Sequence, residues 1–141
     1  MQMSLALRLS VTGIVGLAAL STTHWIRENI SDPPPVLAFA LGVAPNLAAA
    51  FAMPLLLASW FASTSSTPVT VRWRRMYLWV LLFTTSGLFG WELIQIRSAR
   101  FVFDPYDILA TGLGALLAQL AYRWHTSGFE MSHEAAGRGE A

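Results

Sequence analysis

Four long apolar stretches constrain the fold of this chain more than any other feature of its sequence. They cover roughly residues 9–26, 36–61, 76–96 and 108–122, and charged residues or prolines separate them. A helix needs about 20 apolar residues to cross the hydrocarbon core, with a tolerated range of about 17 to 25. The second and third stretches reach this length, the first is marginal, and Tyr122 and Trp124 can extend the short fourth one. We therefore predict an all-α fold, a four-helix transmembrane bundle.

The composition also indicates a membrane environment. Hydrophobic residues make up 55% of the chain and charged residues only 12%, with a mean hydropathy of +0.51. A water-soluble domain typically carries about 25% charged residues. The net charge is +1 and the basic residues are scattered, which excludes nucleic acid as a partner. Without cysteine, the chain has no disulfide, thiolate nucleophile or cysteine metal site.

We expect one transmembrane domain over residues 1–126, with helices at about 5–26, 36–61, 76–96 and 106–123. Residues 127–141 are small, polar and aperiodic, which predicts a disordered cytoplasmic tail. An alternative remains open for the first stretch, because Arg8 and the run that follows it are also typical of a signal peptide. No A-x-A motif precedes the break, so we favour a membrane span.

The arginines predict the orientation, because basic residues accumulate in short cytoplasmic loops. With four spans, one side receives six arginines and the other side receives three. The larger group consists of Arg8, Arg72, Arg74, Arg75, Arg123 and Arg138, and the smaller of Arg27, Arg97 and Arg100. Both termini are thus predicted to be cytoplasmic. All six tryptophans lie near a predicted helix end, as expected for rings at the headgroup level.

Residues 92–107 gather an unusual number of polar groups for such an apolar chain. Glu92 follows Arg75 by a helical length of about 25 Å, and Asp107 precedes Arg123 by about 24 Å. The two carboxylates are therefore expected at one level, at or just inside the extracytoplasmic interface. The short connection between them predicts that the third and fourth helices are antiparallel neighbours.

The helical period predicts the direction of these side chains. Asp107, Thr111 and Gly114 share the small-residue face of the fourth helix, and such faces pack against other helices in lipid. Glu92 and Gln95 share one face of the third helix. A carboxylate near a helix C-terminus and within an apolar run is disfavoured unless it faces a cavity or a partner. We therefore expect a polar site between the two helices, with Arg97 or Arg100 above it.

Simpler structural roles remain open for several of these residues. Asp104 is placed to cap the fourth helix, Pro105 fits its first position, and Asp107 matches the acid of a capping box. Glu92 can form a buried ion pair with an arginine of the loop. In the second helix, Asn46 follows Pro45, and we favour a packing role in which it satisfies a freed carbonyl or reaches a neighbour.

Several chemistries are absent from the sequence. It has no glycine-rich phosphate loop, no H-E-x-x-H and no G-x-S-x-G motif. The histidines, His24, His125 and His133, do not have a metal-ligand spacing. We expect no catalytic residue, no metal site and no cofactor, and whether the chain is an enzyme stays open, with a non-enzyme favoured.

The residues of the polar segment also resemble a known family. Written as E-x-x-Q-x(4)-R-x(6)-D-x(3)-T-x-x-G, they are similar to the C-terminal signature of the VanZ-like family of small bacterial membrane proteins. The match covers about residues 91–122, and Thr111 stands where the family usually has asparagine. The resemblance implies a multi-pass protein of the bacterial inner membrane and cell envelope. Its eponymous member is associated with low-level resistance to the glycopeptide teicoplanin.

The leading hypothesis is a ligand site at the extracytoplasmic end of the third and fourth helices. Glu92 and Asp107 would accept hydrogen bonds or a cation, and Arg100 would bind an anionic group or orient Glu92. Gln95 and Thr111 would fix the geometry, whereas Asp104, Pro105 and Gly114 are expected to be structural. The expected partners are the lipid bilayer, a lipid-linked or cell-wall ligand, and a second copy or another membrane protein.

Two alternatives belong to other functional classes. As an accessory subunit, the chain would dock a larger partner through the small residues of the fourth helix, together with Ser86 and Gly90. A small transporter would need ionisable groups at mid-depth, where the only polar candidate is Asn46, so we rank this alternative last.

Overall fold

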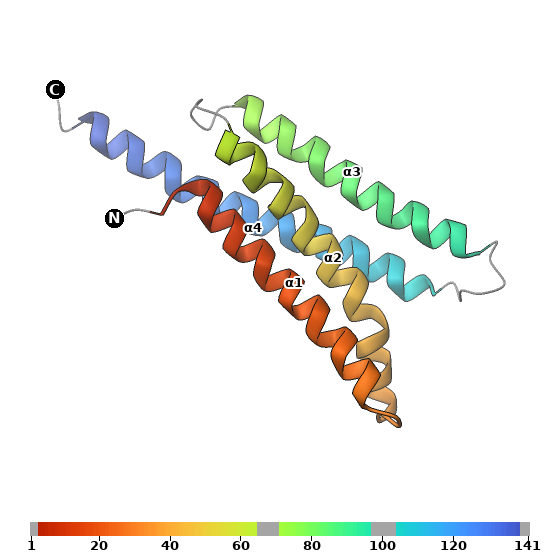
Figure 1. The fold of residues 1–141 in the computed structure, drawn as a ribbon. Helices are drawn as coiled ribbons and strands as arrows, with labels where there is room; N and C mark the ends of the chain where they lie inside the picture. The colour runs from red at the N-terminus through yellow and green to blue at the C-terminus, as the bar shows by residue number, and fades with distance from the viewer. Residues whose placement is uncertain (1–2, 65–70, 97–103, 139–141) are drawn as a thin grey trace.

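The computed structural model describes residues 3–64, 71–96 and 104–138, and all regular secondary structure in these ranges is α-helical. The helices are α1 (Leu5–Asn29), α2 (Pro35–Thr64), α3 (Val71–Gln95) and α4 (Pro105–Arg138), as Figure 1 shows. The predicted all-α, four-helix fold is confirmed. Three helices are long and apolar enough to cross a membrane: α1, α2 and the Trp73–Gln95 part of α3. In the described residues, α4 is not among them, and its apolar run, roughly residues 108–122, is shorter than those of the other helices.

Local sequence sets the helix starts. The Ser4 side chain caps α1 by accepting a hydrogen bond from the backbone N–H of Leu7. Both α2 and α4 begin at a proline. Proline has no backbone N–H, and at the first helical position this costs nothing because an N–H there has no acceptor within the helix. Asp104 Oδ1 accepts a hydrogen bond from the backbone N–H of Tyr106 at 2.9 Å. The capping roles predicted for Asp104 and Pro105 are therefore present.

The last helix is longer than the sequence indicates. Its backbone is helical through Arg138, which differs from the predicted end near residue 123 and from the disordered tail expected from residue 127. The added residues include good helix formers such as Glu, Met and Ala. They extend a helix that is already nucleated, which costs much less than starting a new one.

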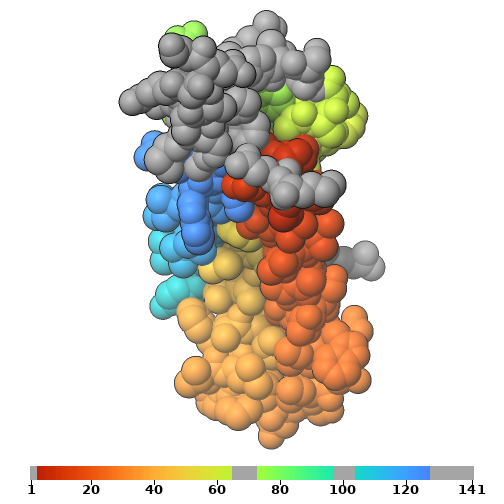
Figure 2. Space-filling view, turned by 90° about the vertical axis from the view of Figure 1, so that its left-hand side faces the viewer, coloured from red at the N-terminus to blue at the C-terminus, as the bar shows by residue number. Residues whose placement is uncertain are grey.

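The second helix organises the bundle. It contacts each of the other three helices, and in the described residues α3 contacts only α2 and α4. Figure 1 shows α1 and α2 side by side, with their connection well separated from the end where α3 leads to α4. In the space-filling view of Figure 2, the end of this hairpin (orange) extends beyond the start of α4 (cyan).

Small residues let the helices approach closely. A Cβ atom at Gly16 of α1 would lie 2.9 Å from the Ala52 Cβ of α2. A Cβ atom at Gly114 of α4 would collide with the carbonyl oxygen of Leu47 and lie 2.9 Å from the Ala50 Cβ. The small-residue face of α4 does point inward, as predicted, and α2 occupies it.

The outward surface is rich in apolar side chains. The opposite face of α4 exposes five leucines: Leu109, Leu113, Leu116, Leu117 and Leu120. Five of the six tryptophans are exposed, but Trp73 is buried and therefore does not act as a surface ring. Apolar surface on this scale is typical of a protein that contacts lipid.

Candidate functional site

The acidic cluster is the group Asn46, Glu92, Gln95, Asp107 and Thr111, contributed by α2, α3 and α4. Glu92 lies in the last turn of α3 and is only 2% exposed. Its Oε1 atom accepts hydrogen bonds from Asn46 Nδ2 at 3.1 Å and from Gln95 Nε2 at 3.3 Å. One oxygen of a buried carboxylate is thus held by two amides, one from its own helix and one from α2.

Asp107 enters the same cluster from the first turn of α4 and is half-buried. Its carboxylate is close enough to Glu92 for the two negative charges to interact. Asn46 also lies near Asp107, so one amide neighbours both acids. Two like charges near one another in an apolar setting repel, and such a pair favours the uptake of a positive charge or a proton.

Three oxygen atoms of the cluster are buried and have no hydrogen-bond partner in the described part of the chain. They are Glu92 Oε2, Asp107 Oδ1 and Thr111 Oγ1. A buried polar atom without a partner typically costs about 1–3 kcal/mol, and more when it is charged. A capping role for Asp107 would give its carboxylate a backbone N–H partner, but among the described residues the Oδ1 atom has no such partner. These oxygens are therefore positioned to accept hydrogen bonds or a cation from outside the chain.

The structure brings together most of the residues singled out from the sequence. Glu92, Gln95 and Asp107 interact as a group, and Thr111 is fully buried one turn further along α4. Gly114 packs against α2 and is structural, as expected. The charge of Asp104 acts on both carboxylates in addition to its capping role. Both arginines considered for the site, Arg97 and Arg100, lie outside the described residues.

Asn46 is the site residue that sequence reasoning underrated. The structure gives it a direct hydrogen bond to Glu92 across the helix interface, which goes beyond local satisfaction of a carbonyl freed by Pro45. Asn46 lies eleven residues after Pro35, or about 16 Å along α2. The sequence did contain a signal for this bond. Asn46 and Glu92 are isolated polar residues in two different apolar stretches, and such groups tend to pair in membranes.

The cluster does not resemble a protein-built metal centre. Within the ranges that the structure describes, no group of three or more histidines and carboxylates could hold a metal ion. Two carboxylates and a hydroxyl can still contact a cation that keeps part of its water shell, or an ammonium group. The arrangement provides acceptors, whereas the amide groups of Asn46 and Gln95 donate to the Glu92 Oε1 atom.

Comparisons with models of known families, with curated proteins and with solved structures find no match to this chain. The resemblance to the VanZ-like family therefore stays a prediction from the sequence. The observations that describe the site are its burial, its hydrogen bonds and its unpartnered oxygens.

Proposed function

We propose that this chain is a multi-pass membrane protein that binds a ligand in the acidic cluster, from the extracytoplasmic side. The proposal takes α4 as a fourth span with both termini cytoplasmic. The exposed leucines of α4 support the fourth span, because lipid would cover this apolar face. The distribution of the arginines supports the orientation.

One observation carries the proposed site: the buried, unpartnered oxygens of Glu92, Asp107 and Thr111. Acceptors without donors match a ligand that brings donors, such as a cation, an ammonium group or several hydroxyl groups. In this role the carboxylates bind the ligand and Gln95 holds the Glu92 side chain in place. Arg100 would add a contact to an anionic part of the same ligand or orient Glu92.

For the cellular role, we propose a VanZ-like protein of the bacterial inner membrane that handles an envelope lipid or a cell-wall precursor. Such ligands carry hydroxyl groups, which can donate hydrogen bonds to the two acids. This role predicts that expression of the chain changes the susceptibility of a bacterial host to teicoplanin.

The test is the replacement of each acid by alanine. Glu92→Ala and Asp107→Ala should abolish the change in teicoplanin susceptibility, while membrane fractionation shows that both variants still insert. Glu28→Ala, which removes an exposed carboxylate from α1, is the matched control and should behave as the unchanged protein. If both cluster variants keep the full phenotype, the proposed site has no function in this role.

A small transporter is the second candidate, and one further observation favours it. Thr85 Oγ1 on α3 and Gln119 Oε1 on α4 are also buried without a hydrogen-bond partner in the described residues. Together with the acidic cluster, these two residues place polar atoms at further positions along α3 and α4. Proton or cation flux in liposomes that is lost in Glu92→Gln and reduced in Thr85→Val would support this candidate, and absence of flux would exclude it.

The fold leaves a smaller docking surface for the accessory-subunit alternative. The small-residue face of α4 proposed for docking is already occupied by α2 at Gly114. Only Ser86 and Gly90 of α3 remain of that surface, and a Cβ at Gly90 would meet nothing within 4 Å. Loss of the isolated chain on expression, with recovery on co-expression with a membrane partner, is the result that would favour this alternative.

A further inference from the structure

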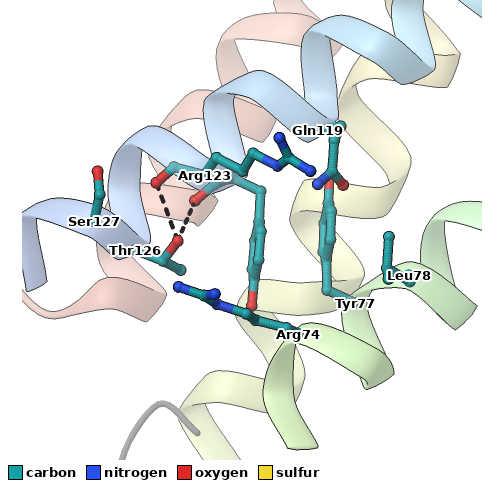
Figure 3. Close-up of a pocket in the computed structure, with 8 residues that line it drawn as sticks. Arg74, Tyr77, Leu78, Gln119, Arg123, Thr126 and Ser127 are labelled. Atoms are coloured by element: carbon teal, nitrogen blue, oxygen red, sulfur yellow. Dashed lines mark hydrogen bonds between the residues drawn. The ribbon is translucent and has the colours of Figure 1, made fainter. Parts of the chain in front are cut away.

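A second polar region lies at the opposite end of α3 and α4. It is a cavity of about 380 Å³, which we call the basic pocket, and Figure 3 shows its lining. Its walls are formed by Arg74, Tyr77, Leu78, Gln119, Tyr122, Arg123, Thr126 and Ser127. Tyr77 precedes Glu92 by fifteen residues, or about 22 Å of helix, so this pocket is separate from the acidic cluster.

Two arginines determine the charge of this pocket. Arg74 reaches it from α3 and Arg123 from α4, and none of the eight lining residues is acidic. Figure 3 shows the Arg74 side chain on α3 and the Arg123 side chain on α4. A guanidinium group offers a planar fork of donors that matches carboxylate and phosphate oxygens.

Further polar atoms in the wall lack a partner. Tyr77 is fully buried, and neither its hydroxyl nor Gln119 Oε1 has a hydrogen-bond partner in the described part of the chain. Figure 3 shows the Tyr77 hydroxyl directed toward Gln119. A hydroxyl beside an amide can rotate to donate to a bound anion, so the wall contributes donors besides the arginines.

The wall is rigid because two aromatic rings form part of it. Tyr77 and Tyr122 stack with 3.7 Å between ring centroids and 3° between ring planes. Both rings belong to the main buried cluster of the bundle, which also includes Leu9 and Leu55. A pocket built on packed core residues loses little conformational entropy when it binds a ligand.

We propose that the basic pocket binds a phosphate group, supplied either by the headgroup of an anionic phospholipid or by free phosphate. Phosphate oxygens accept hydrogen bonds from guanidinium groups and from a tyrosine hydroxyl, and no acid is among the described residues that line this pocket. The pocket lies at the end where most arginines are predicted to be cytoplasmic, at the depth of lipid headgroups. This proposal is independent of the function assigned to the acidic cluster.

The neighbouring Arg75 provides a matched control. It lies one residue after Arg74 on α3 and carries the same charge at nearly the same depth, but it faces a different surface. It lines a separate apolar hollow between α2 and α3, with Leu57, Phe61, Met76, Trp79, Val80 and Phe83. If only the overall positive charge attracts phosphate, Arg75→Gln weakens binding as much as Arg74→Gln.

The lipid arm uses the full chain in nanodiscs of phosphatidylcholine with and without phosphatidylglycerol, followed by native mass spectrometry of the released protein. We expect the unchanged protein to retain phosphatidylglycerol. Arg74→Gln or Arg123→Gln should lower the ratio of retained phosphatidylglycerol to phosphatidylcholine about tenfold, which is the loss of one charge-assisted contact. Arg75→Gln should change this ratio by less than about twofold.

The second arm titrates inorganic phosphate into the protein in detergent, by calorimetry. Binding in this arm alone assigns the site to free phosphate, and retention in the lipid arm alone assigns it to a headgroup. Should a variant lose its helical circular dichroism signal, Ser127→Glu replaces it, because it adds a carboxylate at an exposed wall position. Equal effects of the three arginine variants, or no binding in either arm, would overturn the proposal.

Discussion

The two polar regions of this molecule lie on the same pair of helices and differ in almost every other respect. Tyr77 and Glu92 are fifteen residues apart on α3, and Asp107 and Tyr122 are fifteen residues apart on α4. The acidic cluster contains the buried Glu92 and Thr111, carries acceptors and includes Asn46 of α2. The basic pocket is hollow, carries exposed arginines and is formed by α3 and α4 alone.

The difference follows from side-chain size. Near the acidic cluster, Gly114 brings α4 against the backbone of α2, which closes the interior and places Asn46 beside the acids. At the other end, two stacked tyrosines stand between α3 and α4 and leave space beside them. One helix pair thus produces a closed site and an open one without any change of secondary structure.

The largest effect is expected at the stacked rings. Tyr77→Ala removes a fully buried ring from the core and should lower the free energy of unfolding by about 3–5 kcal/mol. Trp79→Ala, two residues later, removes an exposed ring and should cost less than about 0.5 kcal/mol. Denaturation followed by circular dichroism in detergent measures both. Similar losses would show that the stacked Tyr77 ring stabilises the fold no more than an exposed ring does.

A somewhat smaller effect is expected where α4 meets α2. Gly114→Ala forces a Cβ against the Leu47 carbonyl oxygen and should cost about 1–3 kcal/mol. Gly112→Ala, where a Cβ would meet nothing within 4 Å, should be neutral or slightly stabilising because alanine favours a helix. The same unfolding measurement compares them. An equal tolerance at both glycines would contradict the close approach of the two backbones.

Within the acidic cluster, Asn46→Ala removes one of the two donors to Glu92 Oε1. We expect a loss of about 1–2 kcal/mol, because the carboxylate stays buried with one hydrogen bond fewer. Asn29→Ala, which removes an exposed amide bonded to the Trp25 carbonyl oxygen, should cost less than about 0.5 kcal/mol. If Asn46→Ala is neutral, Asn46 does not stabilise the cluster.

The smallest effect concerns pH at the basic end. His125 lies beyond the predicted fourth span, 2.9 Å from the Thr12 hydroxyl, and burial together with the Arg8 charge lowers its pKa below 6.5. The unfolded chain then binds more protons than the folded one just below pH 6.5, so stability should fall as the pH falls through that value. His125→Gln should remove this part of the decline between pH 7.5 and 5. An unchanged profile would show that His125 does not contribute to it.

The fold was largely accessible from the sequence because membrane helices obey strong length and polarity constraints. Apolar stretches of sufficient length predicted the helices, and the face of α4 with Thr111 and Gly114 was identified from spacing alone. The extension of α4 to Arg138 was missed, because a polar, aperiodic sequence does not exclude a helix that continues from a nucleated one.

The candidate site was only partly accessible. Helical phase and depth placed Glu92 and Asp107 together, since both lie on helices joined by a short loop. The contribution of Asn46 depends on how α2 packs against α3. Helical periodicity predicts which face of one helix is polar, but it does not predict how two helices cross. The basic pocket was missed for a related reason: Arg74 and Arg123 were counted as orientation signals, and their convergence depends on the stacking of Tyr77 on Tyr122.

The unequal helix lengths have a consequence for the bilayer itself. With 30 residues, α2 is about 45 Å long, against a hydrocarbon thickness of about 30 Å. In a membrane, a helix of this length would have to tilt, protrude or thicken the lipid locally. A change in the tilt of α2 relative to α3 would move Asn46, so we expect membranes of different thickness to alter the hydrogen bond between Asn46 and Glu92.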